Sequence, residues 1–511
     1  MAIFQSILTL LLVAVFLLQV SRRLAIPYPT MLATAGLAVA ALPWAPEISI
    51  DPKLVMALFI APAILDAAYD FPPRAIRRYW LPLFALVVVA VLLTTAAVAW
   101  VGVAVGGLPM AAAVALGAIV APPDAAAAAA ILNRPSLPRS TATVLKGESL
   151  LNDAVALFIF GVALRMTQTG DSVLHELPQL AFAIPGGLLL GFVMARTAIA
   201  ITPFLAGTLG GIVFQFLVTF STWIVADRLG LSTILAVVVA AMTVARRAGD
   251  SLSASDRLHS NAVWSIVVFV LNVLAFLFVG LQARGIVQDL SRDELRHAVG
   301  FASLVLAVVI VVRIAWMLVY NRLAQPAYRW IGMTAPTLAQ VVVASWCGMR
   351  GMVTLAAALA LPAAFPHRSL VLLTALGVVL GTLVLQGLLL EPLIRLLRFP
   401  VDHTFDEKLL RARRVLLDAA IDSLPESDDA TAHAMRTLYL AERAEPNPAS
   451  NEKMSRADHI RLDVIRKQRD MLDTMRRSQE IDDETFRALL KELDLSELAA
   501  RRREGIDLTD D

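Results

Sequence analysis

Hydrophobic residues follow one another along most of the chain in runs about 20 residues long, separated by short polar stretches. A helix crosses a hydrocarbon layer of about 30 Å with about 20 apolar residues. Backbone groups in lipid must pair within their own segment, so such runs predict transmembrane helices. Thirteen spans are expected, at residues 3–20, 24–44, 54–70, 81–105, 110–131, 147–166, 178–196, 203–226, 231–245, 262–283, 299–320, 337–361 and 369–392. The pattern therefore predicts an all-α polytopic membrane protein.

Two of the expected spans carry helix-breaking residues at their middle. The fifth contains Pro122, Pro123 and Asp124, and the twelfth contains Gly348, Arg350 and Gly351. Proline removes a backbone donor, and glycines weaken a helix, so each span should unwind near the bilayer midplane. Interrupted segments in corresponding positions of two halves point to a transporter site between inverted repeats. The two spans lie seven apart, which fits repeats made of spans 1–6 and 8–13.

Composition and charge divide the chain at about residue 400. The whole sequence is 58% hydrophobic with a mean hydropathy of +0.71 and a net charge of +2. Residues 401–511 hold 19 basic and 26 acidic side chains, which predicts a charged tail outside the membrane after a membrane domain at 1–400. Loops expected inside carry fourteen basic residues against six outside. This bias predicts an outside N-terminus and a cytoplasmic tail. Nucleic-acid binding needs a basic face, and neither part of the chain offers one.

Six ionisable side chains lie well inside the expected spans. They are Asp66, Asp124, Glu148, Asp153, Arg313 and Arg350. Charges in hydrocarbon are costly and usually mark a pathway. If each arginine takes one acid, two carboxylates remain, and these must bind either a cation or protons. Competition of a monovalent cation and a proton for one carboxylate site is the minimum requirement for exchange.

The densest polar cluster lies at Gly147–Asp153. Ser149 and Asp153 are four residues apart and so are neighbours on a helix face, where a hydroxyl oxygen and a carboxylate suit a hard cation. Alternatively, Glu148 and Ser149 only cap the span, and Asp124 only caps the second half of its own span. Arg350 needs an acidic partner, for which Glu148 is the candidate, and Arg313 is paired with Asp66.

Several segments resemble a known family. They are GESLLNDA at Gly147–Ala154, APxD at Ala121–Asp124, STILAVVVAA at Ser232–Ala241, NVLAFLFVGLQ at Asn272–Gln282 and WCGMRGMVTLAAALALP at Trp346–Pro362. Together they resemble the sodium/proton exchangers of the monovalent cation:proton antiporter superfamily, and NhaP-type bacterial members most of all. The resemblance implies thirteen spans in two inverted six-helix repeats with crossed broken helices, an elevator-type motion and a homodimer in the inner membrane. It implies core spans at 81–166 and 299–392, and dimerisation or scaffold spans at 3–70 and 203–283.

The resemblance also assigns roles to residues. Asp153 would bind cation and proton in turn, helped by Asp124 and Ser149, while Glu148 and Arg350 would form a structural ion pair. Asn152 before the key aspartate is typical of electroneutral members. The family's Thr-Asp-Pro is replaced here by Pro123-Asp124-Ala125, so the backbone carbonyl of Pro123 or a water would substitute for the threonine hydroxyl. Na⁺ is the expected ion at Asp153 and Asp124, Li⁺ and K⁺ are alternatives, and the expected role is pH homeostasis.

Other functions remain possible from the sequence: a K⁺/H⁺ antiporter, a cation channel gated by the tail, or a proton-coupled symporter. No nucleophile–base set suggests an enzyme, and no cofactor is expected. The tail has amphipathic helix patterning at His459–Arg477 and Phe486–Glu504, separated from earlier residues by a proline-containing linker at Ala444–Asn451. Its role, regulatory or none, is left open by the sequence.

Overall fold

The computed structural model describes residues 12–21, 23, 27–40, 51–124, 139–169, 173–205, 207–251, 254–287, 291–330, 335–397, 399, 404–425, 430–444, 456–478, 486, 489–490 and 492–497. The chain divides into two compact units, Met1–Val401 and Asp402–Asp511. Within the described ranges the regular structure is entirely helical and no strand occurs. The expected all-α fold is confirmed.

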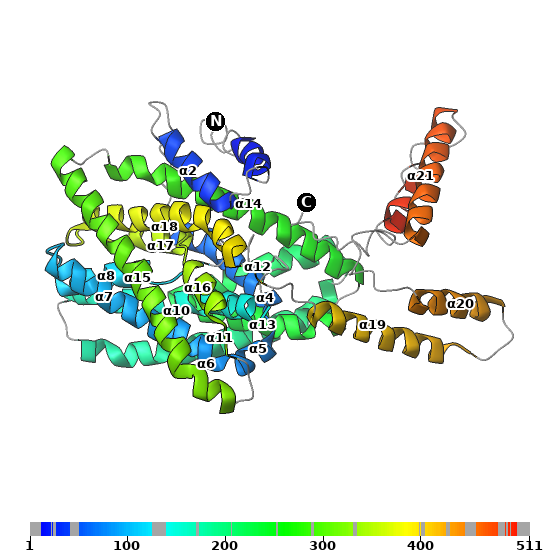
Figure 1. Cartoon of the computed structure of the whole chain (residues 1–511), viewed down its shortest axis with the longest axis horizontal. Helices are drawn as coiled ribbons and strands as arrows, with labels where there is room; N and C mark the ends of the chain where they lie inside the picture. Colours follow the sequence, from blue (N-terminus) through cyan, green and yellow to red (C-terminus); the bar gives the residue numbers. More distant parts are fainter. Residues whose placement is uncertain are drawn as a thin grey trace. The chain divides into compact units, whose positions relative to one another are not determined.

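The first unit is a helical bundle (Figure 1). Its helices are α2 (Tyr28–Ala40), α3 (Pro52–Val55), α4 (Ala61–Asp70), α5 (Pro73–Arg78), α6 (Trp80–Phe84), α7 (Val91–Ala104), α8 (Met110–Val120), α10 (Arg139–Thr169), α11 (Val173–Leu205), α12 (Leu209–Arg228), α13 (Thr233–Ser251), α14 (Ala254–Val287), α15 (Arg292–Trp330), α16 (Leu338–Trp346), α17 (Met352–Leu359) and α18 (Arg368–Leu397). Two π-helical stretches, η1 (Met56–Ile60) and η2 (Ala85–Ala90), join α3 to α4 and α6 to α7.

Seven helices in the described ranges are long and apolar enough to cross a membrane: 80–104, 139–167, 182–205, 209–228, 256–282, 292–326 and 368–397. Shorter apolar helices lie at Leu12–Ser21, in α2 and in α8. These lengths and compositions agree with a multi-pass membrane protein. The number thirteen, the inverted repeats and the sidedness stay predictions.

Glycines allow several helices of this unit to touch backbone to backbone. A Cβ on Gly36 of α2 would lie 2.5 Å from the carbonyl oxygen of Leu277 in α14, and a Cβ on Gly280 of α14 would overlap the Ala33 carbonyl. A Cβ on Gly117 of α8 would lie 2.5 Å from the Thr95 carbonyl oxygen in α7. Small residues are the usual means by which membrane helices approach closely. The pairs α2–α14 and α7–α8 are therefore held at short range by residues that have no side chain.

The second unit contains α19 (Thr404–Ser423), α20 (Ala430–Ala444) and α21 (Arg456–Arg477). Arg443 of α20 forms an ion pair with Asp418 of α19 at 3.1 Å, and Arg469 of α21 forms one with Asp494 at 2.5 Å. Helix α21 covers the segment His459–Arg477 that the sequence predicts to be helical. Most of the predicted linker and of the segment Phe486–Glu504 lies outside the described residues.

Candidate functional site

Two helix interruptions meet in the first unit. Helix α8 ends at Val120, and Ala121–Asp124 follow without helical structure, because Pro122 and Pro123 supply no backbone donors. Cys347–Gly351 separate α16 from α17. The amide of Asp124 donates to the carbonyl of Met349 at 2.7 Å. The predicted interruption of the twelfth span is confirmed. Residues 125–138, and with them the expected cap for a second half of the fifth span, lie outside the described residues.

The Asp124 side chain occupies the space that a side chain at position 351 would need. A Cβ on Gly351 would overlap the Asp124 carboxylate, so only glycine leaves room for that group here. The carboxylate is partly exposed and lies within electrostatic range of Asp153. Both residues thus lie where two interruptions and a third helix converge.

Helix α10 supplies the residues of the Gly147–Asp153 cluster. Asn152 is fully buried and donates from Nδ2 to the Pro123 carbonyl at 2.9 Å, and Asp153 is 9% exposed. Ser149, one turn earlier, is partly buried. Because α10 begins at Arg139, Glu148 and Ser149 lie in its interior, and the alternative that they only cap a helix is wrong. The Pro123 carbonyl, expected as a cation ligand, accepts the bond from Asn152.

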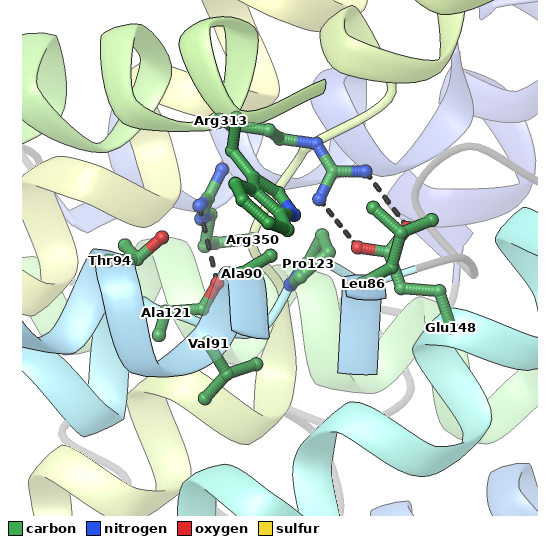
Figure 2. A pocket seen from close by; sticks show the side chains of 10 residues that line it. Leu86, Ala90, Val91, Thr94, Ala121, Pro123, Glu148, Arg313 and Arg350 are labelled. Atoms are coloured by element: carbon green, nitrogen blue, oxygen red, sulfur yellow. Dashed lines mark hydrogen bonds and ion pairs between the residues drawn. The ribbon is translucent and has the colours of Figure 1, made fainter. Parts of the chain in front are cut away.

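Glu148 pairs with Arg313 and not with Arg350, so the pairing inferred from sequence is wrong. Arg313 of α15 donates from Nη1 to Glu148 Oε1 at 2.6 Å and from Nη2 to Oε2 at 3.0 Å, as the dashed lines in Figure 2 show. It also donates to the carbonyls of Ala344 and Ser345 at the end of α16. The suggested Arg313–Asp66 pair is wrong for the same reason. Asp66 lies in α4, within electrostatic range of Asp70.

Arg350 is fully buried and its guanidinium binds backbone carbonyls. Nε donates to Val120 at 3.0 Å, Nη2 donates to Ala121 at 3.3 Å, and Nη1 donates to Gly348. Val120 and Ala121 end α8, where carbonyl groups lack helical partners and the helix dipole is negative. The backbone amide of Arg350 donates to Thr382 Oγ1 of α18 at 3.0 Å. Arg350 thus caps one interrupted helix while its own backbone forms part of the other interruption.

A small cavity lies beside these two arginines (Figure 2). Residues of η2, α7 and α15 complete its wall; the lining residues are Leu86, Ala90, Val91, Thr94, Ala121, Pro123, Glu148, Arg313, Trp316 and Arg350. Asp153 does not line it. The ion pair and the Asp124–Asp153 region are therefore separate parts of one polar centre.

With every acid and base counted in its ionised form, the charges of this centre leave one negative charge in excess. Its acids are Asp124, Glu148 and Asp153, and its bases are Arg313 and Arg350. Sequence reasoning missed the carbonyl-binding role of Arg350 and the bond from Asn152 to Pro123. The two-proline break, which leaves carbonyls exposed, was the available signal for both. No group of three or more His, Cys, Asp or Glu side chains arranged to hold a metal occurs among the described residues.

Buried charges where two helix interruptions meet, within a bundle of apolar membrane-length helices, are typical of membrane transporters. The chain belongs to the sodium/hydrogen exchanger family: the model of its transmembrane domain matches residues 7–396. Membership places the protein among cation/proton antiporters, which are transporters and not enzymes.

Named relatives agree with this assignment, and a solved structure has a similar fold. An uncharacterized Na(+)/H(+) exchanger of Mycobacterium tuberculosis is 30% identical over 92% of this chain and 91% of its own length. A sodium, potassium, lithium and rubidium/H(+) antiporter of Bacillus pumilus is 30% identical over 78% of this chain and 62% of its own. The fold is similar to that of the sodium proton antiporter MjNhaP1 of Methanocaldococcus jannaschii, with a TM-score of 0.59 and 16% identity, covering 78% of this chain and all of that one.

Proposed function

We propose that this protein exchanges one monovalent cation, Na⁺ in the first place, for one proton, and that Asp153 carries each in turn. The observation that supports a one-for-one exchange is the charge balance of the polar centre. The Glu148–Arg313 pair is neutral by itself. In the formal charge count, the one positive charge of Arg350 then stands against the two negative charges of Asp124 and Asp153. A single remaining negative charge is neutralised equally well by one cation or one proton, and neither exchange step moves net charge.

In this proposal the cation is bound by oxygen atoms around the interruption. Asp153 and Asp124 supply carboxylates, and Ser149 lies one turn from Asp153 on the same helix. The Pro123 carbonyl accepts one hydrogen bond from Asn152, and a carbonyl oxygen has a second lone pair for an ion. Hard cations prefer such ligands. Asn152 is neutral where a further aspartate would add a second charge, which favours electroneutral exchange.

We propose alternating access by an elevator-type movement of spans 81–166 and 299–392 against the scaffold spans 3–70 and 203–283, in a homodimer in the cell's inner membrane, with the N-terminus outside. The tight α2–α14 contact at Gly36 and Gly280 supports a rigid scaffold. Regulation of internal pH would be the physiological result.

A K⁺/H⁺ exchange is the second candidate. The Bacillus pumilus relative is named as an antiporter of sodium, potassium, lithium and rubidium. Pro123 also removes the threonine hydroxyl that the family motif carries. Fewer fixed side-chain ligands favour a less selective site, so the cation preference is an open part of the proposal.

The test uses the purified full-length protein in liposomes with an imposed pH gradient and a dye that reports luminal pH. Na⁺, Li⁺ and K⁺ are added in turn, with and without valinomycin to clamp the membrane potential in K⁺ media. We expect cation-dependent collapse of the gradient at a rate that the clamp does not change. Asp153→Asn should abolish it while the protein still inserts, because asparagine neither takes up the proton nor balances the cation.

The antiporter proposal would be overturned if the folded protein did not collapse the pH gradient when Na⁺, Li⁺ or K⁺ was added, at any pH tested. A rate that follows the membrane potential would overturn the one-for-one stoichiometry alone. Ser303→Ala is the control variant. The Ser303 hydroxyl donates a hydrogen bond to the Val299 carbonyl one turn earlier in α15, so this substitution in the same unit should leave exchange unchanged.

A further inference from the structure

A second charged region lies at the neighbouring ends of two apolar helices. Helix α5 carries Arg74, Arg77 and Arg78 and directly precedes the candidate span that starts at Trp80. Arg322 and Arg329 flank the point where the candidate span of α15 ends, at Pro326. All five arginines are exposed, and none forms an ion pair with a described residue.

Two contacts place these ends together. Trp316 Nε1 of α15 donates to the Ala85 carbonyl at 2.9 Å, and further along α15 the phenol of Tyr328 lies within electrostatic range of Tyr79. Helix α15 therefore runs antiparallel to α6 and η2, and its last turns reach the start of α6. We call the five arginines at these two neighbouring helix ends, Arg74, Arg77, Arg78, Arg322 and Arg329, the arginine rim.

The rim also carries aromatic side chains suited to a lipid interface. Trp80 is 56% exposed at the first residue of its span, and the Arg78 guanidinium lies 5.8 Å from the ring centre of Tyr79. Tryptophan and tyrosine prefer the headgroup level of a bilayer. The acid nearest in sequence, Asp70, brings one negative charge against the five positive charges of the rim.

We propose that the arginine rim binds the headgroup of an anionic phospholipid. Guanidinium groups bind phosphate oxygens through paired hydrogen bonds. The rim lies where apolar spans end, so a phosphate at that level belongs to a lipid whose acyl chains lie along α6–α7 and α15. Because α15 also carries Arg313, the bound lipid contacts a helix of the polar centre.

The test measures retention of phosphatidylglycerol and phosphatidylcholine by the full-length protein in neutral detergent micelles, by native mass spectrometry. The wild type should retain phosphatidylglycerol in preference to phosphatidylcholine. Arg74→Gln/Arg77→Gln/Arg78→Gln should lose most of that preference, because each basic group near an anionic surface contributes about a factor of five. The matched control replaces three exposed arginines elsewhere, Arg228→Gln/Arg292→Gln/Arg296→Gln, and should keep it.

Equal loss in both triple variants would overturn the rim as the site, since net charge alone would then explain retention. No preference in the wild type would also overturn it and would leave the arginines with a role in membrane insertion only. The midpoint of thermal unfolding, measured with each lipid, shows that the variants are folded. None of these outcomes depends on transport, so the lipid proposal and the exchange proposal fail separately.

Discussion

Arg313 and Arg350 have the same charge and are both buried, yet their surroundings differ. Arg313 makes a two-bond pair with a carboxylate, whereas Arg350 makes three bonds to carbonyls. Removal of one member of a buried ion pair leaves an uncompensated charge, which costs more than loss of the pair as a whole. The two arginines should therefore respond differently to removal of Glu148.

Arg313→Met should lower the free energy of unfolding by about 3–5 kcal/mol, because it leaves Glu148 buried without its partner. Addition of Glu148→Met should restore much of the loss. Thermal unfolding of the detergent-solubilised variants measures both effects. In Arg350→Met the lost partners are carbonyls, so Glu148→Met should give no comparable rescue. Equal rescue of both arginine variants would contradict the pairing.

The sequence identified six ionisable side chains inside the expected spans, four of which are buried, but both ion pairs that it suggested are wrong. Spacing along one helix is fixed by the helical repeat, so the proximity of Glu148, Ser149, Asn152 and Asp153 could be predicted. Partners on different helices depend on packing, and nothing in the sequence showed that Arg313 faces Glu148 across α10 and α15. The carbonyl contacts of Arg350 were equally invisible, because they involve backbone atoms that every residue possesses.

At the level of elements, the helices and their interruptions could largely be predicted and their contacts could not. The length of the apolar runs predicted the helices, and the glycines at Gly348 and Gly351 predicted the interruption before α17. The π-helical stretches η1 and η2 were not predicted, since a one-residue change of hydrogen-bond register leaves no clear sequence pattern. The glycine contacts between α2 and α14 were also missed. These contacts depend on which faces of α2 and α14 pack together, and the two helices are far apart in the sequence.

Gly280→Ala should destabilise the first unit by about 1–3 kcal/mol, the usual cost of overpacking, because the new methyl group would meet backbone atoms that cannot rotate away. Gly285→Ala is the matched control in the same helix, where a Cβ meets nothing within 4 Å. Thermal unfolding in detergent compares the two. A similar midpoint for both variants would show that α2 can shift away from α14 without cost.

For the whole molecule, the division into two compact units separates the polar centre from the tail. Every residue of the centre belongs to Met1–Val401. Ion pairs between described residues of the tail, such as Arg443–Asp418 and Arg469–Asp494, join residues within the second unit. The stability of the first unit should therefore not require the second.

Deletion of residues 402–511 should leave a protein that inserts, has the unfolding midpoint of the full chain and still exchanges cations for protons. Size-exclusion chromatography and the liposome assay measure this. A changed pH dependence with retained exchange would identify the tail as regulatory. Aggregation or complete loss of exchange would contradict the independence of the first unit.

The hydrogen bond from Asp124 to Met349 also bears on how the protein is made. Ribosomes add about 5–20 residues per second, so Met349 emerges roughly 10 to 45 seconds after Asp124. During that interval the nascent chain has Asp124 but lacks the carbonyl group that accepts the hydrogen bond from its amide. A partly synthesised chain thus lacks this contact between the two interruptions until about two thirds of its 511 residues have been made.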